Sequence, residues 1–287
     1  MSAASPCRTH AAQRWSAAAI GRAATLALHD ELALAPKPGL VSFVDSGSHD
    51  DMDAQTFMRS LFALHGYFVR IAELGAAGAP FAALERCGIE AEARMLAATG
   101  GINTHRGAIF MLGMLCAACA ATQSAGQTTT AGTLRTALQQ RWGHALAARK
   151  LRVSTLPGGI AARRHGLRSA SQEAALGFPA LFEVAVPAWA RARRSGLDQA
   201  RLHLQVFFEI MAVLDDANLA HRGGLDGLRH AREHARAFLA TGGASSPQAC
   251  QQAWRIHRDF VQRRLSPGGC ADTLSAACFL ERIGALG

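Results

Sequence analysis

The spacing of apolar side chains constrains this chain most, because steps of three and four residues recur through nearly all of its 287 positions. Phe57, Leu61, Leu64 and Phe68 are an example, and this spacing puts side chains on one face of an α-helix. No stretch sustains the period-two alternation of a half-buried strand. Alanine and leucine recur while aromatic residues make up only 6%, a composition that favours helices. We therefore expect an all-α protein.

Proline and glycine mark where the helices end. Pro36 and Pro38 should stop the first helix, since proline lacks a backbone N–H and disfavours helix in the residue before it. Residues 104–121 are apolar on nearly all sides and should form the central buried helix. Residues 153–171 look like a long basic loop. We expect helices near residues 12–34, 53–74, 82–99, 104–121, 133–150, 180–195, 198–218, 224–241, 247–265 and 271–286.

Neither an internal repeat nor a linker divides the chain. We expect a single compact multi-helix domain over residues 12–287, with residues 1–11 a disordered N-terminus. The most apolar segment, residues 107–121, is shorter than the ~20 residues that cross a bilayer, so a soluble, cytoplasmic protein is predicted. Cys116 and Cys119, the only close cysteine pair, have no histidine companion, which favours core cysteines over a metal site.

The formal charge is +9, from 30 Lys+Arg against 21 Asp+Glu, and arginine far outnumbers lysine. Arginine suits planar, bidentate recognition of phosphate, although a GC-rich genome would produce the same bias. The charge points to an anionic partner without choosing between nucleotide, nucleic acid and membrane.

Polar residues interrupt this apolar chain in four segments. The first surrounds Lys37, which two prolines stiffen, and continues to Asp50, Asp51 and Asp53 at the start of a helix. Carboxylates so close together repel each other unless a cation or a helix N-terminus compensates. The structural alternative is a solvated acidic turn with Asp51 as the helix cap.

The second segment places His105 and Arg106 after the paired glycines Gly100 and Gly101 and the polar Asn103. The glycines let the backbone approach a ligand closely. Basic side chains are unfavourable at the positive end of a helix, so we expect an anion such as phosphate there.

The third segment is the basic loop, followed by Glu173; taken alone, a solvated charge cluster explains it equally well. Its basic residues are Arg163, Arg164, His165 and Arg168.

The fourth segment follows a strongly apolar helix, and buried carboxylates there need a metal or an arginine partner. It contains Asp215, Asp216, Asn218, His221 and Arg222. Together the four segments supply oxygen ligands for Mg²⁺ and cations for phosphates, as a metal-bound polyphosphate requires. The sequence has no Walker A pattern and no Gly-x-Gly-x-x-Gly after a strand, which argues against a P-loop or Rossmann site.

With these segments the chain resembles the triphosphoribosyl-dephospho-CoA synthases, the helper enzymes of citrate lyase and malonate decarboxylase. The resemblance extends from about residue 31 to residue 275, and residues 41–49 look more like the malonate decarboxylase branch. Ser169 stands where we would expect glycine in that family. The matching motifs are KPGLV (37–41), HDDMD (49–53), Thr56-Phe57 with Ser60, GGINTHRG (100–107), Glu173 with GFP (177–179), Asp216, Asn218, HRGG (221–224), and SPGG (266–269) with Asp272.

The resemblance implies that the 2′-hydroxyl of 3′-dephospho-CoA attacks C1′ of the ATP ribose and that adenine leaves. The product would pass to a holo-acyl-carrier-protein synthase. In this interpretation Glu173 or Asp53 acts as general base, Asn103 and Asn218 orient the ribose or base edges, and the required cofactor is Mg²⁺. The Mg²⁺ ligands would be Asp51, Asp53, Asp215 and Asp216, and the phosphate-binding residues would be Lys37, His105, Arg106, Arg168, His221 and Arg222.

Two other interpretations remain open. A Mg²⁺-dependent hydrolase of ADP-ribosyl compounds or nucleotides would need the same acids and helices. A basic helical nucleic-acid-binding module would retain DNA or RNA in a salt-dependent way, but here the basic residues lie beside acids and form no uninterrupted face. We expect neither nucleic acid nor membrane as a partner, and a homo-oligomer is compatible with the sequence.

Overall fold

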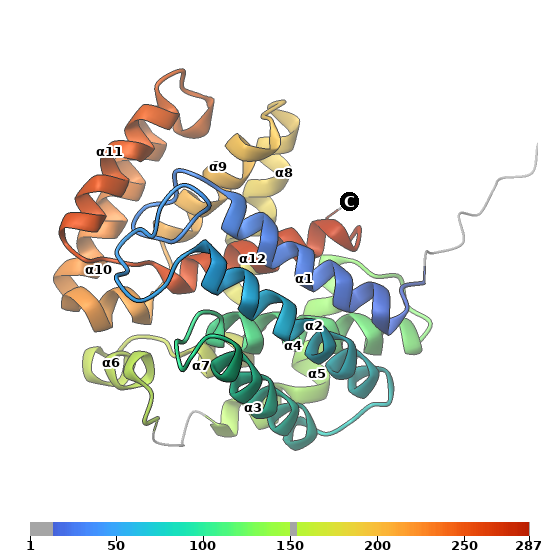
Figure 1. The fold of residues 1–287 in the computed structure, drawn as a ribbon. Coiled ribbons are helices and arrows are strands. Elements are labelled where there is room, and N and C mark those ends of the chain that lie inside the picture. Colours follow the sequence, from blue (N-terminus) through green and yellow to red (C-terminus); the bar gives the residue numbers. More distant parts are fainter. Residues whose placement is uncertain (1–13, 150–153, 287) are drawn as a thin grey trace, which may run out of the picture.

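The computed structural model describes residues 14–149 and 154–286, and within them it contains helices and no strand (Figure 1). The all-α prediction is therefore confirmed. The predicted disordered segment, residues 1–11, lies outside the described residues. The helices are α1 Ala17–Ala33, α2 Ala54–Ala76, α3 Phe81–Ala98, α4 Arg106–Ser124, α5 Ala131–Arg149, α6 Pro157–His165, α7 Ala170–Ala175, the π-helix η1 Ala180–Ala185, α8 Val186–Arg194, α9 Gln199–Met211, α10 Ala217–Ala240, the short 3₁₀-helix η2 Gly243–Ser245, α11 Ala249–Gln262 and α12 Gly268–Arg282.

Helix α4 is the centre of the hydrophobic core, as its sequence predicts. It packs against α1, α2, α3, α5 and α12. Cys116 and Cys119 lie fully buried on it as free thiols, and burial raises the pKa of both. These cysteines are core residues.

Helix α4 is also long and apolar enough to cross a membrane by length and composition alone. However, 78% of its most apolar window is buried inside the protein. This burial is that of a core helix.

Short polar side chains begin many of the helices. Ser16, Asp53, Ser169, Asp198 and Asp216 each accept a hydrogen bond from a backbone N–H of the first helical turn, which satisfies donors that have no partner inside the helix. The cap of α2 is Asp53, not Asp51. Ser169 forms a capping box with Gln172, so serine suits this position without the glycine that we expected.

The loop between α1 and α2 is fastened to the turn between α11 and α12. Ser48 Oγ donates to the backbone oxygen of Leu265 at 2.6 Å, and His49 Nε2 lies 2.9 Å from Ser266 Oγ. A Cβ on Gly39, whose φ is +67°, would lie 2.1 Å from the same Leu265 oxygen, so only glycine fits this contact. Figure 1 shows this blue loop running beside α10 and α11.

Two segments differ from the prediction. Residues 154–171 do not form one long loop: Pro157 starts α6 and Gly166, with φ +64°, ends it. The predicted helix over residues 198–218 stops at Met211, because Asp216 uses its side chain to begin α10. Asp215 therefore lies between two helices and does not share a helix face with Asn218.

Candidate functional site

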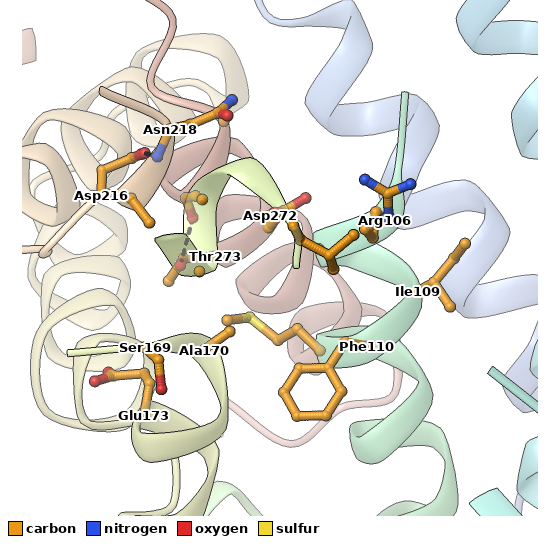
Figure 2. A pocket seen from close by; sticks show the side chains of 18 of the residues that line it. Arg106, Ile109, Phe110, Ser169, Ala170, Glu173, Asp216, Asn218, Asp272 and Thr273 are labelled. Carbon is orange, nitrogen blue, oxygen red and sulfur yellow. Dashed lines mark hydrogen bonds between the residues drawn. The ribbon is translucent and has the colours of Figure 1, made fainter. Parts of the chain in front are cut away.

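One large cavity, with a volume of about 1520 Å³, collects most of the polar residues that the sequence singles out. Its walls come from the beginnings of α4, α10 and α12, from α6 and α7, and from the loop before α2. Figure 2 shows Arg106, Glu173, Asp216, Asn218 and Asp272 arranged around this space. The cavity brings together residues that are more than 200 positions apart in the sequence.

Asp216 is almost fully buried, at 1% exposure. Its Oδ1 accepts hydrogen bonds from the backbone N–H groups of Asn218 and Leu219, and Oδ2 accepts one from Cys270 at 3.0 Å. Burial raises the pKa of Asp216, and these hydrogen bonds oppose the rise. The carboxylate thereby ties the start of α10 to the start of α12 (Figure 2).

Asp272, on the first turn of α12, lies against the beginning of α4. A Cβ on Gly107 would lie 1.9 Å from its Oδ2, and the backbone of Ala108 forms a hydrogen bond with the carboxylate. The position at which we expected an anion is thus taken, at least in part, by a side chain of the protein itself. Burial, and then the charges of Glu31 and Asp216, raise the pKa of Asp272 well above its usual value.

The two basic residues at the start of α4 need no phosphate to compensate them. Arg106 forms an ion pair with Glu92, with Nη2 2.5 Å from Oε1. His105 is buried, its Nδ1 lies 2.6 Å from Ser60 Oγ, and its Nε2 has no hydrogen-bond partner among the described residues. Burial and the nearby Lys37 lower the pKa of His105 to about 3, so the ring is neutral. Basic side chains at this positive helix end therefore do not by themselves require a bound anion. Both residues line the cavity, and their phosphate-binding roles stay predictions.

Basic residues from the other segments also line the cavity. Arg222 donates to the backbone oxygens of Ser48 and Arg264, and its Nη2 lies 3.0 Å from His49 Nδ1. Burial lowers the pKa of Arg222 from its usual value. His221, Arg163 and Arg168 are also part of the lining, whereas Arg164 is not.

Glu173 lines the cavity with both oxygens already bonded. Arg168 Nη1 donates to its Oε2 at 2.8 Å, and the backbone N–H of Ala180 donates to its Oε1 at 2.7 Å. Asp215 pairs with Arg232 at 2.6 Å and accepts from the backbone N–H of Arg168 at 3.3 Å. The sequence predicts either a metal or an arginine as the partner of this carboxylate, and in the structure the partner of Asp215 is Arg232.

Lys37 lies behind the cavity and is not among its lining residues. Its fully buried Nζ donates to the backbone oxygen of Glu31 at 2.6 Å and to the Glu31 carboxylate. Burial lowers the pKa of Lys37, and the charge of Glu31 opposes this. Glu31 itself lines the cavity, so the pair supports the wall from inside.

The predicted metal ligands are only partly brought together. Asp51, Asp215 and Asp216 line the cavity, whereas Asp53 does not and caps α2 through Thr56. Within residues 14–149 and 154–286, no three of these carboxylates bring ligand oxygens within 4.8 Å of one another. Magnesium ions commonly use one or two carboxylates and complete their shell with water and substrate phosphate, and the acidic lining of this cavity fits that donor set.

Asp272 and Glu31 are two acidic cavity residues to which the sequence assigns no role. Asp272 stood within a recognised motif, but its importance arises from the approach of α12 to α4, which no local pattern reveals. Glu31 occupies the last turns of a helix, where its position predicts a solvated acid. Lys37 follows six residues later, but its burial, which makes a carboxylate partner necessary, is visible only in the structure.

Comparison with known proteins places this chain in a family. The family described as ATP:dephospho-CoA triphosphoribosyl transferase matches residues 17–287. A probable 2-(5''-triphosphoribosyl)-3'-dephosphocoenzyme-A synthase of Acinetobacter calcoaceticus is 36% identical over 260 residues, covering 91% of this chain and 89% of the relative. A probable synthase of the same name from Azotobacter vinelandii is 37% identical over 282 residues, covering 96% and 93%. No solved structure matches this chain.

Proposed function

The chain belongs to the ATP:dephospho-CoA triphosphoribosyl transferase family, and from this premise we propose that the cavity is where the triphosphoribosyl group of ATP moves to the 2′-hydroxyl of 3′-dephospho-CoA. The protein is a transferase, and adenine is the leaving group of the proposed reaction. The observation that carries the proposal is a single cavity lined both by buried acids and by several arginines.

The cavity suits the charges of this reaction. Both substrates carry phosphates, which the lining residues Arg163, Arg168 and Arg222 can bind. The ribose gains positive charge as adenine departs, as in glycoside chemistry, and nearby carboxylates stabilise such charge. Asp272 and Asp216, near the starts of α12 and α10, are our candidates for this role; positive charge on the ribose or a bound cation would offset the rise in their pKa values.

Proton transfer requires a group that accepts the proton of the attacking hydroxyl. Of the two candidates from the sequence, Glu173 lines the cavity and Asp53 does not, which favours Glu173. Arg168 holds its Oε2, so this arginine would have to turn toward substrate phosphate to free the carboxylate. Asn103 and Asn218 also line the cavity and can hydrogen-bond the ribose or the base edge.

We propose that Asp272 and Asp216 hold the Mg²⁺ that accompanies the triphosphate. When bound, the ion would neutralise phosphate charge and orient the chain of phosphates. Asp51 lies on the exposed rim and Asp215 is paired with Arg232, so both are less available than Asp272 for this role.

Mass spectrometry of ATP and dephospho-CoA incubated with the protein tests this function. We expect a product containing dephospho-CoA and triphosphoribose, one adenine released per product, and loss of both when EDTA removes Mg²⁺. Asp272→Asn should lower turnover by roughly 100-fold or more, while its amide oxygen can still accept the hydrogen bond from Ala108. Asp226→Asn, on an exposed residue of α10 outside the cavity, is the matched control and should retain full activity.

A hydrolase would give a different result in the same assay. It would release adenine from ATP alone, without dephospho-CoA, and form free triphosphoribose. Wild-type turnover in Asp272→Asn, with its thermal stability unchanged, would also contradict the proposed site.

The final destination of the product is a further proposal. The sequence of residues 41–49 supports malonate decarboxylase rather than citrate lyase, with a holo-acyl-carrier-protein synthase as the next enzyme and the cytoplasm as the location. Incubating the purified product with each apo-carrier protein and its own attaching synthase checks this branch.

A further inference from the structure

A second polar cluster lies on the other half of α10, away from the cavity. His230 and His234 are one helical turn apart on α10, and Asp259 faces them from α11. Among the described residues, these three form the group of histidine, cysteine or acidic side chains whose ligand atoms all lie within 4.8 Å of one another. None of the three lines the transfer cavity.

The distances are close to those of a metal site. His230 Nε2 lies 2.5 Å from Asp259 Oδ2, and His234 Nε2 lies 3.7 Å from the same oxygen. Ligand atoms around a tetrahedral zinc ion lie roughly 3.3 Å apart, and all three ligand atoms here lie within 4.8 Å of one another, so each pair needs to change its separation by about 1.5 Å or less. The His230–Asp259 contact alone is an ordinary ion pair. At 3.7 Å the distance from His234 Nε2 to Asp259 Oδ2 is too long for a hydrogen bond. The His230–Asp259 ion pair therefore does not explain why His234 also lies in this cluster.

A neighbouring side chain holds Asp259 in an orientation that suits a metal ligand. Arg263 Nε donates to Asp259 Oδ1 at 3.0 Å, so Oδ2 is the oxygen that faces the two histidines. Metal-ligating carboxylates commonly accept such a hydrogen bond from a neighbouring residue.

Water can reach the cluster, because the side chains of His230, His234 and Asp259 are all partly exposed. A groove of about 470 Å³ also runs beside His230, so a water molecule can complete the coordination. Two imidazoles, one carboxylate and one water are a donor set that Zn²⁺ takes.

We propose that His230, His234 and Asp259 bind one Zn²⁺ ion that fastens α10 to α11. Helix α10 bends at Gly224, and its first half carries Asn218, His221 and Arg222 of the cavity. Helix α11 leads into the turn at Leu265 and Ser266 that holds the Ser48–His49 loop. The ion therefore braces the wall of the cavity from outside and takes no part in the transfer.

Zinc binding by the full-length, untagged and chelator-treated chain tests this site. We expect one equivalent of Zn²⁺, measured by competition with a chromogenic zinc indicator, with a dissociation constant in the micromolar range or below. His234→Ala should weaken this binding more than ~100-fold, and the thermal midpoint should rise with zinc in the wild type but not in the variant. Co²⁺ in place of zinc should give the strong visible absorption of a tetrahedral site in the wild type only.

His144→Ala is the matched control, because His144 is an exposed histidine on α5, and it should bind zinc as the wild type does. Circular dichroism establishes that each variant is folded. If His234→Ala unfolds, Asp259→Asn removes a different ligand and replaces it in the test. Equal affinity in wild type and both ligand variants would place the ion elsewhere and overturn the proposal, as would the lack of saturable binding below millimolar zinc.

Discussion

His105 shows how burial changes the chemistry that a residue type suggests. Its sequence position, beside Arg106 at a helix start, predicts a cation that binds phosphate. In the structure burial and Lys37 lower its pKa to about 3, and Ser60 bonds its Nδ1. A neutral imidazole can donate one hydrogen bond and accept another, but it cannot neutralise the charge of a phosphate. The phosphate-binding role of His105 therefore stays a prediction that its surroundings do not favour.

The low pKa of His105 makes stability depend on pH. A histidine whose pKa is lower in the folded state contributes stability above the unfolded pKa of about 6.5, and this is lost as the pH falls toward 3. Lowering the pH from 7.5 to 5 should therefore lower the free energy of unfolding by about 2 kcal/mol through His105 alone. Urea titrations at both pH values should show that His105→Asn loses less stability than the wild type by this amount.

The control for this prediction is His144→Asn, which alters an exposed histidine. It should lose as much stability as the wild type, and the buried His203, whose pKa burial lowers to about 4, contributes equally in all three proteins. The same loss in His105→Asn as in the wild type would contradict a neutral His105.

Asp272 shows that a sequence alone does not reveal what a single polar residue contacts. The polar segments were recognised because charged residues interrupt an apolar pattern, and most of their side chains do line one cavity. Which of them face a ligand and which hold the fold together depends on contacts between distant segments. Lys37 with Glu31, and Asp53 with Thr56, belong to the second group by their geometry.

At the scale of elements, apolar periodicity located most helices to within a few residues. The errors occur where a side chain starts a new helix inside an apolar stretch, as Asp216 does, or where proline and glycine enclose a short one, as at α6. Periodicity reports which face is buried and is insensitive to a break between two helices that share a core. Capping residues carry that information.

The contact between α2 and α4 depends on one glycine of α2. A Cβ on Gly75 would lie 2.2 Å from the backbone oxygen of Ala117 on α4, and backbone cannot move aside cheaply. We expect Gly75→Ala to lower the free energy of unfolding by about 2 kcal/mol or more, measured by urea denaturation.

The same helix supplies the control. A Cβ on Gly66 meets no atom within 4 Å, so Gly66→Ala should leave stability unchanged or raise it by up to ~1 kcal/mol, because alanine favours helix over glycine. Similar effects from the two substitutions would refute the close contact.

For the whole molecule, the sequence predicts one all-helical body but not which helix ends meet. The described helices pack around one continuous hydrophobic core, and this packing directs the starts of α4, α10 and α12 toward one cavity. The convergence follows from the packing of distant helices, which a single sequence does not encode in any local pattern. The central claim is therefore spatial: these helix starts together hold the two substrates.

Hydrogen–deuterium exchange of the full chain, with and without Mg²⁺, ATP and dephospho-CoA, tests that claim most directly. Substrate should slow amide exchange in residues 103–109, 215–222 and 266–273, because these backbones border the occupied cavity. Exchange in α8 should stay unchanged, since Val186–Arg194 contributes no lining residue. Protection confined to other parts of the chain, with these three segments unaffected, would contradict the account.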